Sequence, residues 1–180
     1  QAAARLFPLR VPHGFVARMH KGDPHDPLLR QVLPLAEECL TAAGFGADPV
    51  GDMAAMAVPG LLHKYRARVL LTVTGACAVH CRYCFRRHFP YADANPAADR
   101  WHAALEYIAG DDSITEVILS GGDPLTLSDR RLAELARQLE AIPHLRRLRL
   151  HTRLPIVLPE RVNHELLAWL GDTKLKPVIV

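Results

Sequence analysis

Short apolar runs alternate with amphipathic segments through the second part of the chain. The apolar runs lie at residues 69–74, 116–119, 148–152 and 176–180, and each has the length of a buried strand. The segments between them carry apolar residues at helical spacing, at about 96–109, 128–140 and 159–170, and Ser128 is a good helix-capping residue. Strands that are apolar on both faces and separated by helices predict a parallel sheet with helices packed outside it, either an open doubly wound sheet or a barrel.

The first 62 residues have a different pattern. They are rich in Pro and Gly and contain one amphipathic stretch at residues 26–38, where Leu28, Leu29, Val32, Leu33 and Leu35 are able to form one apolar face. We therefore expect a mainly helical extension at 1–62, followed by an α/β region at 63–180.

Composition narrows the class of protein. Hydrophobic residues make up 49% of the 180 residues, which is enough for one core. The net charge of +3 is a balance of 22 basic and 19 acidic residues, which argues against a nucleic-acid groove or a membrane-surface patch. No apolar run approaches the roughly 18 residues of a membrane span, and the cysteine usage suggests a reducing compartment, so a cytoplasmic location is the expectation.

Three of the four cysteines crowd into the loop after the first apolar run. Cys77, Cys81 and Cys84 have the spacing Cys-x3-Cys-x2-Cys, and no fourth cysteine is near. Three thiolates bind three irons of a four-iron cluster and leave the fourth iron open to an external ligand, whereas an electron carrier has four thiolates. The spacing therefore favours an enzyme with a ligand on the open iron.

Two other interpretations of these cysteines remain open. A zinc site could combine the three thiolates with His80 or His88, and residues 81–84 could form a thioredoxin-like redox pair. Cys39 lies far away in the sequence and receives no role.

The loop after the second apolar run contains Ser120, Gly121, Gly122 and Asp123. Paired glycines allow a close backbone approach to a ligand, and the Asp123 carboxylate can accept from an ammonium group, although the same sequence also forms ordinary tight turns. In a parallel sheet this loop opens on the same edge as the cysteine loop. Arginines around the cysteines, together with Arg153, suit a ligand that carries carboxylate or phosphate groups, or they form a solvated basic stretch.

Taken together, these segments resemble the lysine 2,3-aminomutase family of radical S-adenosylmethionine enzymes. The resemblance covers essentially the whole chain and is densest at residues 26–32, 58–65, 77–91, 120–125 and 149–159. It implies a partial (β/α)6 TIM-like barrel, here with about three βα units and a fourth strand. Tyr83 and Phe85 are similar to the branch that makes β-lysine for the modification of elongation factor P.

The family resemblance also implies cofactors and residue roles. A [4Fe-4S] cluster on the three cysteines would bind S-adenosylmethionine, and pyridoxal 5′-phosphate would hold the lysine whose amino group migrates from C2 to C3. The implied contacts to S-adenosylmethionine are Tyr83, Ser120, Gly121, Gly122, Asp123 and Arg153. The implied contacts on the phosphate side of pyridoxal phosphate are Lys64, Tyr65 and Arg68, and Arg86 is expected to bind the lysine carboxylate.

Further expectations concern partners and completeness. The resemblance implies an electron donor such as flavodoxin or ferredoxin and an indirect link to elongation factor P and its ligase. Family members continue well past Val180 and carry there the lysine that anchors pyridoxal phosphate, so we expect these 180 residues alone to hold the cluster without converting lysine. An exposed strand edge is expected at 178–180. An aminomutase for another amino acid, such as glutamate, and a non-catalytic zinc module remain alternatives.

Overall fold

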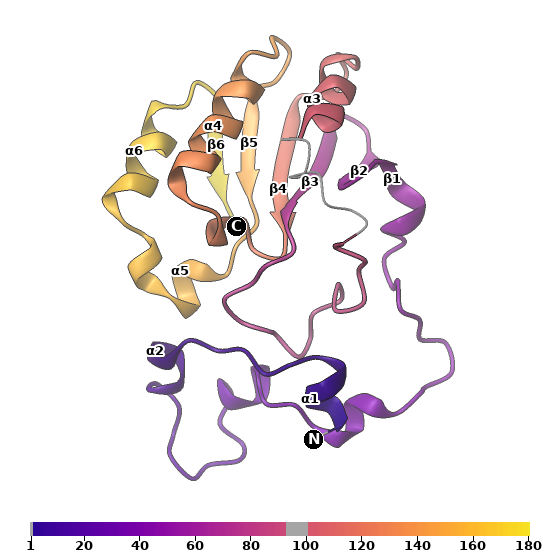
Figure 1. Ribbon diagram of the computed structural model, residues 1–180, viewed down its shortest axis with the longest axis vertical. Coiled ribbons are helices and arrows are strands. Elements are labelled where there is room, and N and C mark those ends of the chain that lie inside the picture. The colour runs from indigo at the N-terminus through magenta and orange to yellow at the C-terminus, as the bar shows by residue number, and fades with distance from the viewer. Residues whose placement is uncertain (1, 93–100) are drawn as a thin grey trace.

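One six-stranded sheet forms the centre of the molecule in the computed structural model, which describes residues 2–92 and 101–180 (Figure 1). The strands follow chain order across the sheet: β1 Met56–Val58, β2 Leu61–Tyr65, β3 Arg68–Thr74, β4 Glu116–Gly121, β5 Arg147–Leu150 and β6 Lys176–Ile179. The strands from β3 to β6 are parallel, as the sequence predicted. The first two strands pair antiparallel with their neighbours, which the sequence did not predict.

Three helices cover one face of the parallel strands. They are α3 His102–Ala109, α4 Asp129–Glu140 and α6 His164–Asp172. Their apolar residues share one buried core with the strand residues that point to the same face, namely Val69, Leu71, Val73, Val117, Leu119, Leu148 and Leu150. Because all three helices lie on this one face and the sheet does not close, the arrangement is an open, partial TIM-like barrel.

The helices differ in detail from those predicted. The start of the first, at residues 96–100, lies outside the described residues, and Ser128 is the N-cap of α4 without a side-chain capping bond. The continuous helix expected at 159–170 is wrong: α5 spans Leu154–Val157, a 3-10 turn spans Pro159–Arg161, and α6 begins after Asn163. The side chain of Asn163 accepts a hydrogen bond from the N–H of Leu166 at 2.9 Å, and this cap starts the helix.

The helical pieces of the extension are all short, and β1 and the start of β2 also fall within residues 1–62. These helical pieces are α1 Ala2–Leu6, α2 His13–Val16 and the 3-10 turns Leu29–Gln31, Ala36–Cys39 and Met53–Ala55. The amphipathic helix expected at 26–38 is therefore wrong, since Pro34 interrupts it. Val32 is buried, but Leu33 and Leu35 are exposed. The boundary at residues 62 and 63 stays a prediction.

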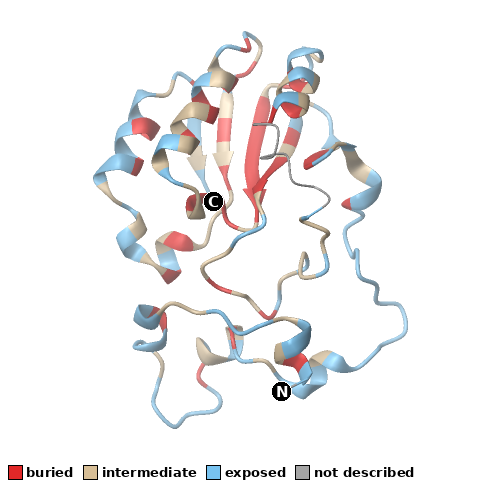
Figure 2. Cartoon of the chain, in the orientation of Figure 1, coloured by how far each residue is buried: buried red, intermediate tan, exposed pale blue. Residues whose placement is uncertain are grey.

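Burial follows this arrangement. All residues of β4 are buried, whereas most of the extension is exposed (Figure 2). The extension lies against the loop that follows β3 (Figure 1), where the backbone N–H groups of His80 and Arg82 donate to the carbonyls of Arg10 and Gln31 at 2.9 and 2.8 Å. The cysteine loop is thus held between the sheet and the extension. None of the described helices has the length and apolar character that crossing a membrane requires.

Candidate functional site

The three clustered cysteines line one cavity at the carboxyl edge of the parallel strands. Cys77, Cys81 and Cys84 are free thiols, each partly buried, on the loop after β3. The cavity has a volume of about 580 Å³. All six residues expected to contact S-adenosylmethionine line the same cavity: Tyr83, Ser120, Gly121, Gly122, Asp123 and Arg153. The structure therefore brings these two sets of residues together, and their contacts with a ligand stay a prediction.

The environment of the thiols disfavours their charged form. Burial raises the pKa of Cys77 to about 12, and the neighbouring Asp123 carboxylate adds to the effect. Burial also raises the pKa of Cys84. A metal that binds here must displace these protons, so its binding strengthens as pH rises.

Both paired glycines are required by the packing of two loops. Gly121 has a φ of +119°, and a Cβ there would lie 2.3 Å from the carbonyl oxygen of Thr74. A Cβ on Gly122 would lie 2.1 Å from the carbonyl oxygen of Ala76. The N–H of Gly122 donates to the Thr74 carbonyl at 2.7 Å. The glycines thus fix the position of the cysteine loop against the end of β4, a structural role beside the ligand contact that the sequence suggested.

Asp123 is a buried link between two loops. Its carboxylate accepts hydrogen bonds from the Thr152 hydroxyl at 2.6 Å, from the Arg153 N–H at 2.7 Å and from the Leu125 N–H at 3.0 Å. Burial raises the pKa of this carboxyl, while those hydrogen bonds oppose the shift. The carboxylate therefore organises the ends of β4 and β5, and its contact with an ammonium group stays a prediction.

Arg153 reaches from the end of β5 to the cysteine loop. Its guanidinium donates to the sulfur of Cys81 at 2.9 Å and to the Gln31 side chain at 2.9 Å. It also donates to the Tyr83 hydroxyl and lies over the Tyr83 ring, 5.3 Å from the ring centre. Arg153 thus connects one cysteine, one aromatic side chain and the extension.

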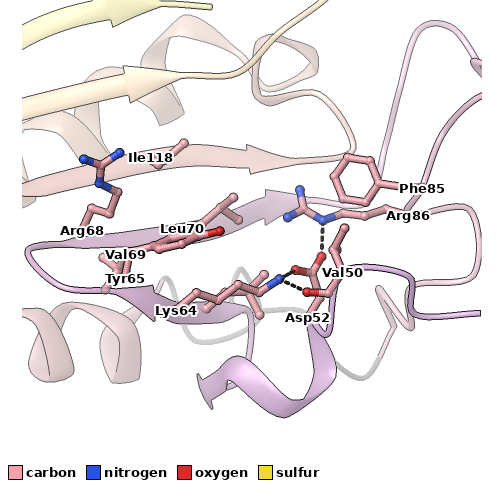
Figure 3. Close-up of a pocket in the computed structure, with 11 residues that line it drawn as sticks. Val50, Asp52, Lys64, Tyr65, Arg68, Val69, Leu70, Phe85, Arg86 and Ile118 are labelled. Atoms are coloured by element: carbon pink, nitrogen blue, oxygen red, sulfur yellow. Dashed lines mark hydrogen bonds and ion pairs between the residues drawn. The ribbon is translucent and has the colours of Figure 1, made fainter.

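A second cavity adjoins the first on the open face of the sheet (Figure 3). Its volume is about 180 Å³, and Lys64, Tyr65, Arg68 and Arg86, the residues expected to contact pyridoxal phosphate and the substrate carboxylate, all line it. Phe85 and Arg86 line both cavities. The two predicted ligand sites are therefore neighbours that share these two residues.

A carboxylate that the sequence did not single out joins the cations of the second cavity. The Asp52 carboxylate accepts from Lys64 Nζ at 2.5 Å and from Arg86 Nε at 2.7 Å (Figure 3), and its side chain is only 3% exposed. Burial alone would raise the pKa of Asp52, but the hydrogen bonds and charges of Arg86 and Lys64 together lower it. Arg86 also donates to the Ser120 hydroxyl at 3.2 Å, which ties this cavity to the end of β4.

Two other arginines of the cysteine loop bind neither a ligand nor solvent in the way that the sequence suggested. Arg82 and Arg87 both pair with the Glu38 carboxylate of the extension, Arg87 at 2.8 Å. Arg82 is buried and also donates to the Phe7 carbonyl at 2.8 Å. They are therefore neither free for an anionic ligand nor a solvated stretch, because they fasten the extension to the loop.

Comparison with known families adds to this geometry. The profile described as the radical SAM superfamily matches residues 71–168, from β3 into α6. The chain belongs to the radical SAM superfamily. It is also 53% identical to an L-lysine 2,3-aminomutase from Haemophilus influenzae and 52% identical to one from Escherichia coli. These matches cover 99% and 100% of this chain, which spans about half the length of each relative (53% and 52%).

The donor set fits the cluster that this superfamily carries. Three free thiols on one loop line one cavity. Cys77, Cys81 and Cys84 would hold a four-iron cluster by three thiolates, which would leave one iron for an external ligand. Within the described ranges, no three His, Cys, Asp or Glu side chains are placed to hold a single metal ion. The ring of His80, considered as a zinc ligand, stacks on Phe7 with centroids 4.6 Å apart, and its Nδ1 lies 2.8 Å from the Pro8 carbonyl.

The sequence did not identify several residues that organise the site, because no local pattern marks them. Asp52 and Glu38 act on arginines 34 and 44 residues away. Tyr91 donates to the Gly121 carbonyl at 2.7 Å, and its place in the densest part of the family resemblance was the one available signal.

Proposed function

We propose that this chain forms the cofactor-binding half of a lysine 2,3-aminomutase that uses a [4Fe-4S] cluster, S-adenosylmethionine and pyridoxal phosphate. The observation that carries the proposal is the pair of adjoining cavities, one lined by three thiols and the other by Lys64, Arg68 and Arg86, with Phe85 and Arg86 common to both. These two shared residues would place a substrate in the second cavity beside a ligand in the first. The similarity to L-lysine 2,3-aminomutases supports lysine as the substrate.

The chain's own residues would hold these groups by charge and by shape. When bound, the cluster supplies the electron that cleaves the sulfonium of S-adenosylmethionine, and pyridoxal phosphate supplies the electron sink that allows the amino group to migrate. Lys64 and Arg68 offer cations to a phosphate, and Arg86 offers a guanidinium fork to a carboxylate. The cavity walls of Leu70 and Ile118 exclude water from reactive species.

The finer parts of the proposal rest on the loop sequence and on the relatives. Tyr83 and Phe85 support the assignment of this chain to the branch whose product modifies elongation factor P. We propose a cytoplasmic location for the protein. Because the chain spans about half of its relatives' length, we expect the 180 residues alone to bind the cluster and S-adenosylmethionine without converting lysine.

Anaerobic reconstitution tests the proposal in two stages. Iron and sulfide are quantified for the 180-residue chain, and the electron paramagnetic resonance spectrum of the reduced cluster is recorded with and without S-adenosylmethionine. A spectrum that changes on addition supports an open iron, whereas stoichiometric zinc in a colourless protein would refute it. The full-length natural protein is then incubated with lysine or glutamate, and formation of the corresponding β-amino acid is expected from lysine only.

A further inference from the structure

Arg153 differs from the other arginines around the cysteines in its partners. Arg82, Arg86 and Arg87 each form an ion pair with a carboxylate. The ion pairs formed within residues 2–92 and 101–180 do not include Arg153. Within these ranges, no neighbouring acid therefore offsets the positive charge of its guanidinium.

The guanidinium of Arg153 contacts a sulfur instead of a carboxylate. Its terminal nitrogen Nη1 donates to Cys81 Sγ at 2.9 Å. Cys81 is one of the three thiols expected to hold the four-iron cluster. The charge of Arg153 thus lies one hydrogen bond away from a sulfur that would bind iron.

Contacts at both ends fix the Arg153 side chain in this position. Its other terminal nitrogen donates to Gln31 Oε1 at 2.9 Å, and the Gln31 amide itself donates to the Pro27 carbonyl at 3.1 Å. The guanidinium also lies over the ring of Tyr83. The backbone N–H of Arg153 donates to the buried Asp123 carboxylate at 2.7 Å. The charge is therefore held in place before any ligand binds.

A fixed positive charge beside a cluster sulfur favours the reduced form of the cluster. Hydrogen bonds to the sulfurs, together with the charge and the solvent exposure of the surroundings, set the reduction potential of an iron–sulfur cluster. Uptake of one electron makes the cluster more negative by one charge, so its attraction to a nearby guanidinium increases. Arg153 is half-buried, which limits the screening of this attraction by water.

We propose that Arg153 raises the reduction potential of the cluster through its hydrogen bond to Cys81, and that Gln31 of the extension positions it for this role. The role is distinct from the contact with S-adenosylmethionine that the family resemblance implies for the same residue. The inference rests on the proposed function, because it requires the cluster, and it adds the property that Arg153 controls.

A redox titration of the reconstituted full-length natural protein, in the absence of S-adenosylmethionine, tests this role. Mediators hold the solution at the wild-type midpoint potential, and electron paramagnetic resonance gives the ratio of reduced to oxidised cluster. Arg153→Gln should lower this ratio by about tenfold, which is about 59 mV for a one-electron couple. Arg153→Lys keeps the charge and should lower it by less than about threefold. The matched control Arg137→Gln removes an exposed arginine from α4 and should leave the ratio unchanged.

A second variant keeps Arg153 and changes the residue that positions it. Gln31→Glu places a carboxylate where the Gln31 oxygen now accepts from the guanidinium. The new ion pair offsets the charge beside Cys81, so the ratio should fall by about threefold. Gln138→Glu makes the same chemical change on α4 and should have no effect. Iron and sulfide are quantified in every variant, and Gln31→Glu decides the question where Arg153→Gln does not hold its cluster.

A wild-type ratio in cluster-loaded Arg153→Gln or in Gln31→Glu would overturn the proposal. It would also be overturned by an Arg153→Gln protein that differs from the wild type only in needing more S-adenosylmethionine to change its spectrum, because a contact with that ligand alone has this effect. A wild-type protein that binds zinc in place of iron would instead contradict the proposed function.

Discussion

Glu38 is the residue whose removal should reveal how strongly the extension holds the cysteine loop. Its carboxylate pairs with both Arg82 and Arg87, and the side chains of Glu38 and Arg82 are only 14% and 7% exposed. Burial alone would raise the pKa of Glu38, but hydrogen bonds from Arg82, from the Leu35 N–H and from Arg87 lower it from 4.5 to about 2. The substitution Glu38→Gln keeps the shape of the side chain and removes this charge.

The magnitude follows from the lowered pKa. A decrease from 4.5 to about 2 corresponds to about 3 kcal/mol of stabilisation at neutral pH, and solvent contact reduces this to about 2–3 kcal/mol. Because the folded-state pKa is the lower one, the contribution is complete well above pH 4.5 and disappears as pH falls toward about 2. At pH 3 it is about 1 kcal/mol.

Urea denaturation of the iron-free chain at pH 7 and pH 3, followed by circular dichroism, measures the effect. The free energy of unfolding of Glu38→Gln should lie below that of the wild type by about 2–3 kcal/mol at pH 7 and by less than half of that at pH 3. Glu37→Gln is the matched control, since Glu37 is the exposed neighbour. An equal loss in both variants, or a loss that is the same at both pH values, would refute the reasoning.

Three further substitutions test other parts of the site. Gly122→Ala should lower the free energy of unfolding by about 3 kcal/mol or more in a urea titration, because its Cβ would lie 2.1 Å from a carbonyl oxygen. Gly171→Ala is the control: a Cβ there has nothing within 4 Å, so the free energy of unfolding should change by less than about 1 kcal/mol. Cys81→Ala should lower iron and sulfide content on reconstitution, and Cys39→Ala should leave both unchanged. Asp52→Asn leaves two cations without their shared carboxylate and should cost about 3 kcal/mol of unfolding free energy; a loss below about 0.5 kcal/mol would contradict the ion pairing.

The sequence predicted the parts of the fold that depend on local pattern. The four parallel strands were found because each is a short apolar run between helical segments. The cysteines and the residues expected to contact S-adenosylmethionine fell on one edge because carboxyl ends of parallel strands meet there. The hairpin strands were missed because β1 has only three residues and β2 is only partly apolar. Val162 and Asn163 separate the 3-10 turn from α6, two pieces that the apolar spacing of residues 159–170 had joined into one helix.

Ion pairs were the part of the site that the sequence could not predict, and the reason is combinatorial. With 22 basic and 19 acidic residues, many pairings are available, and the spacing of a buried pair across the fold leaves no periodic signal. Four arginines near the cysteines appeared equivalent in the sequence, yet the structure separates them: Arg82 and Arg87 bind Glu38, Arg86 binds Asp52, and Arg153 contacts Cys81.

This separation changes how the charge around the cysteine loop is understood. An arginine paired with a buried carboxylate is neutralised and fixed in place, so it positions the loop, whereas an arginine that faces a cavity keeps donors for a ligand. Arg86 does both, since Asp52 binds its Nε while the rest of its guanidinium lies between the two cavities. A carboxylate that fixes one edge of a guanidinium also fixes the side chain. The arginine then loses less conformational entropy when a ligand binds to the other edge. Asp52 therefore fixes one edge of the Arg86 guanidinium without binding all of its donors.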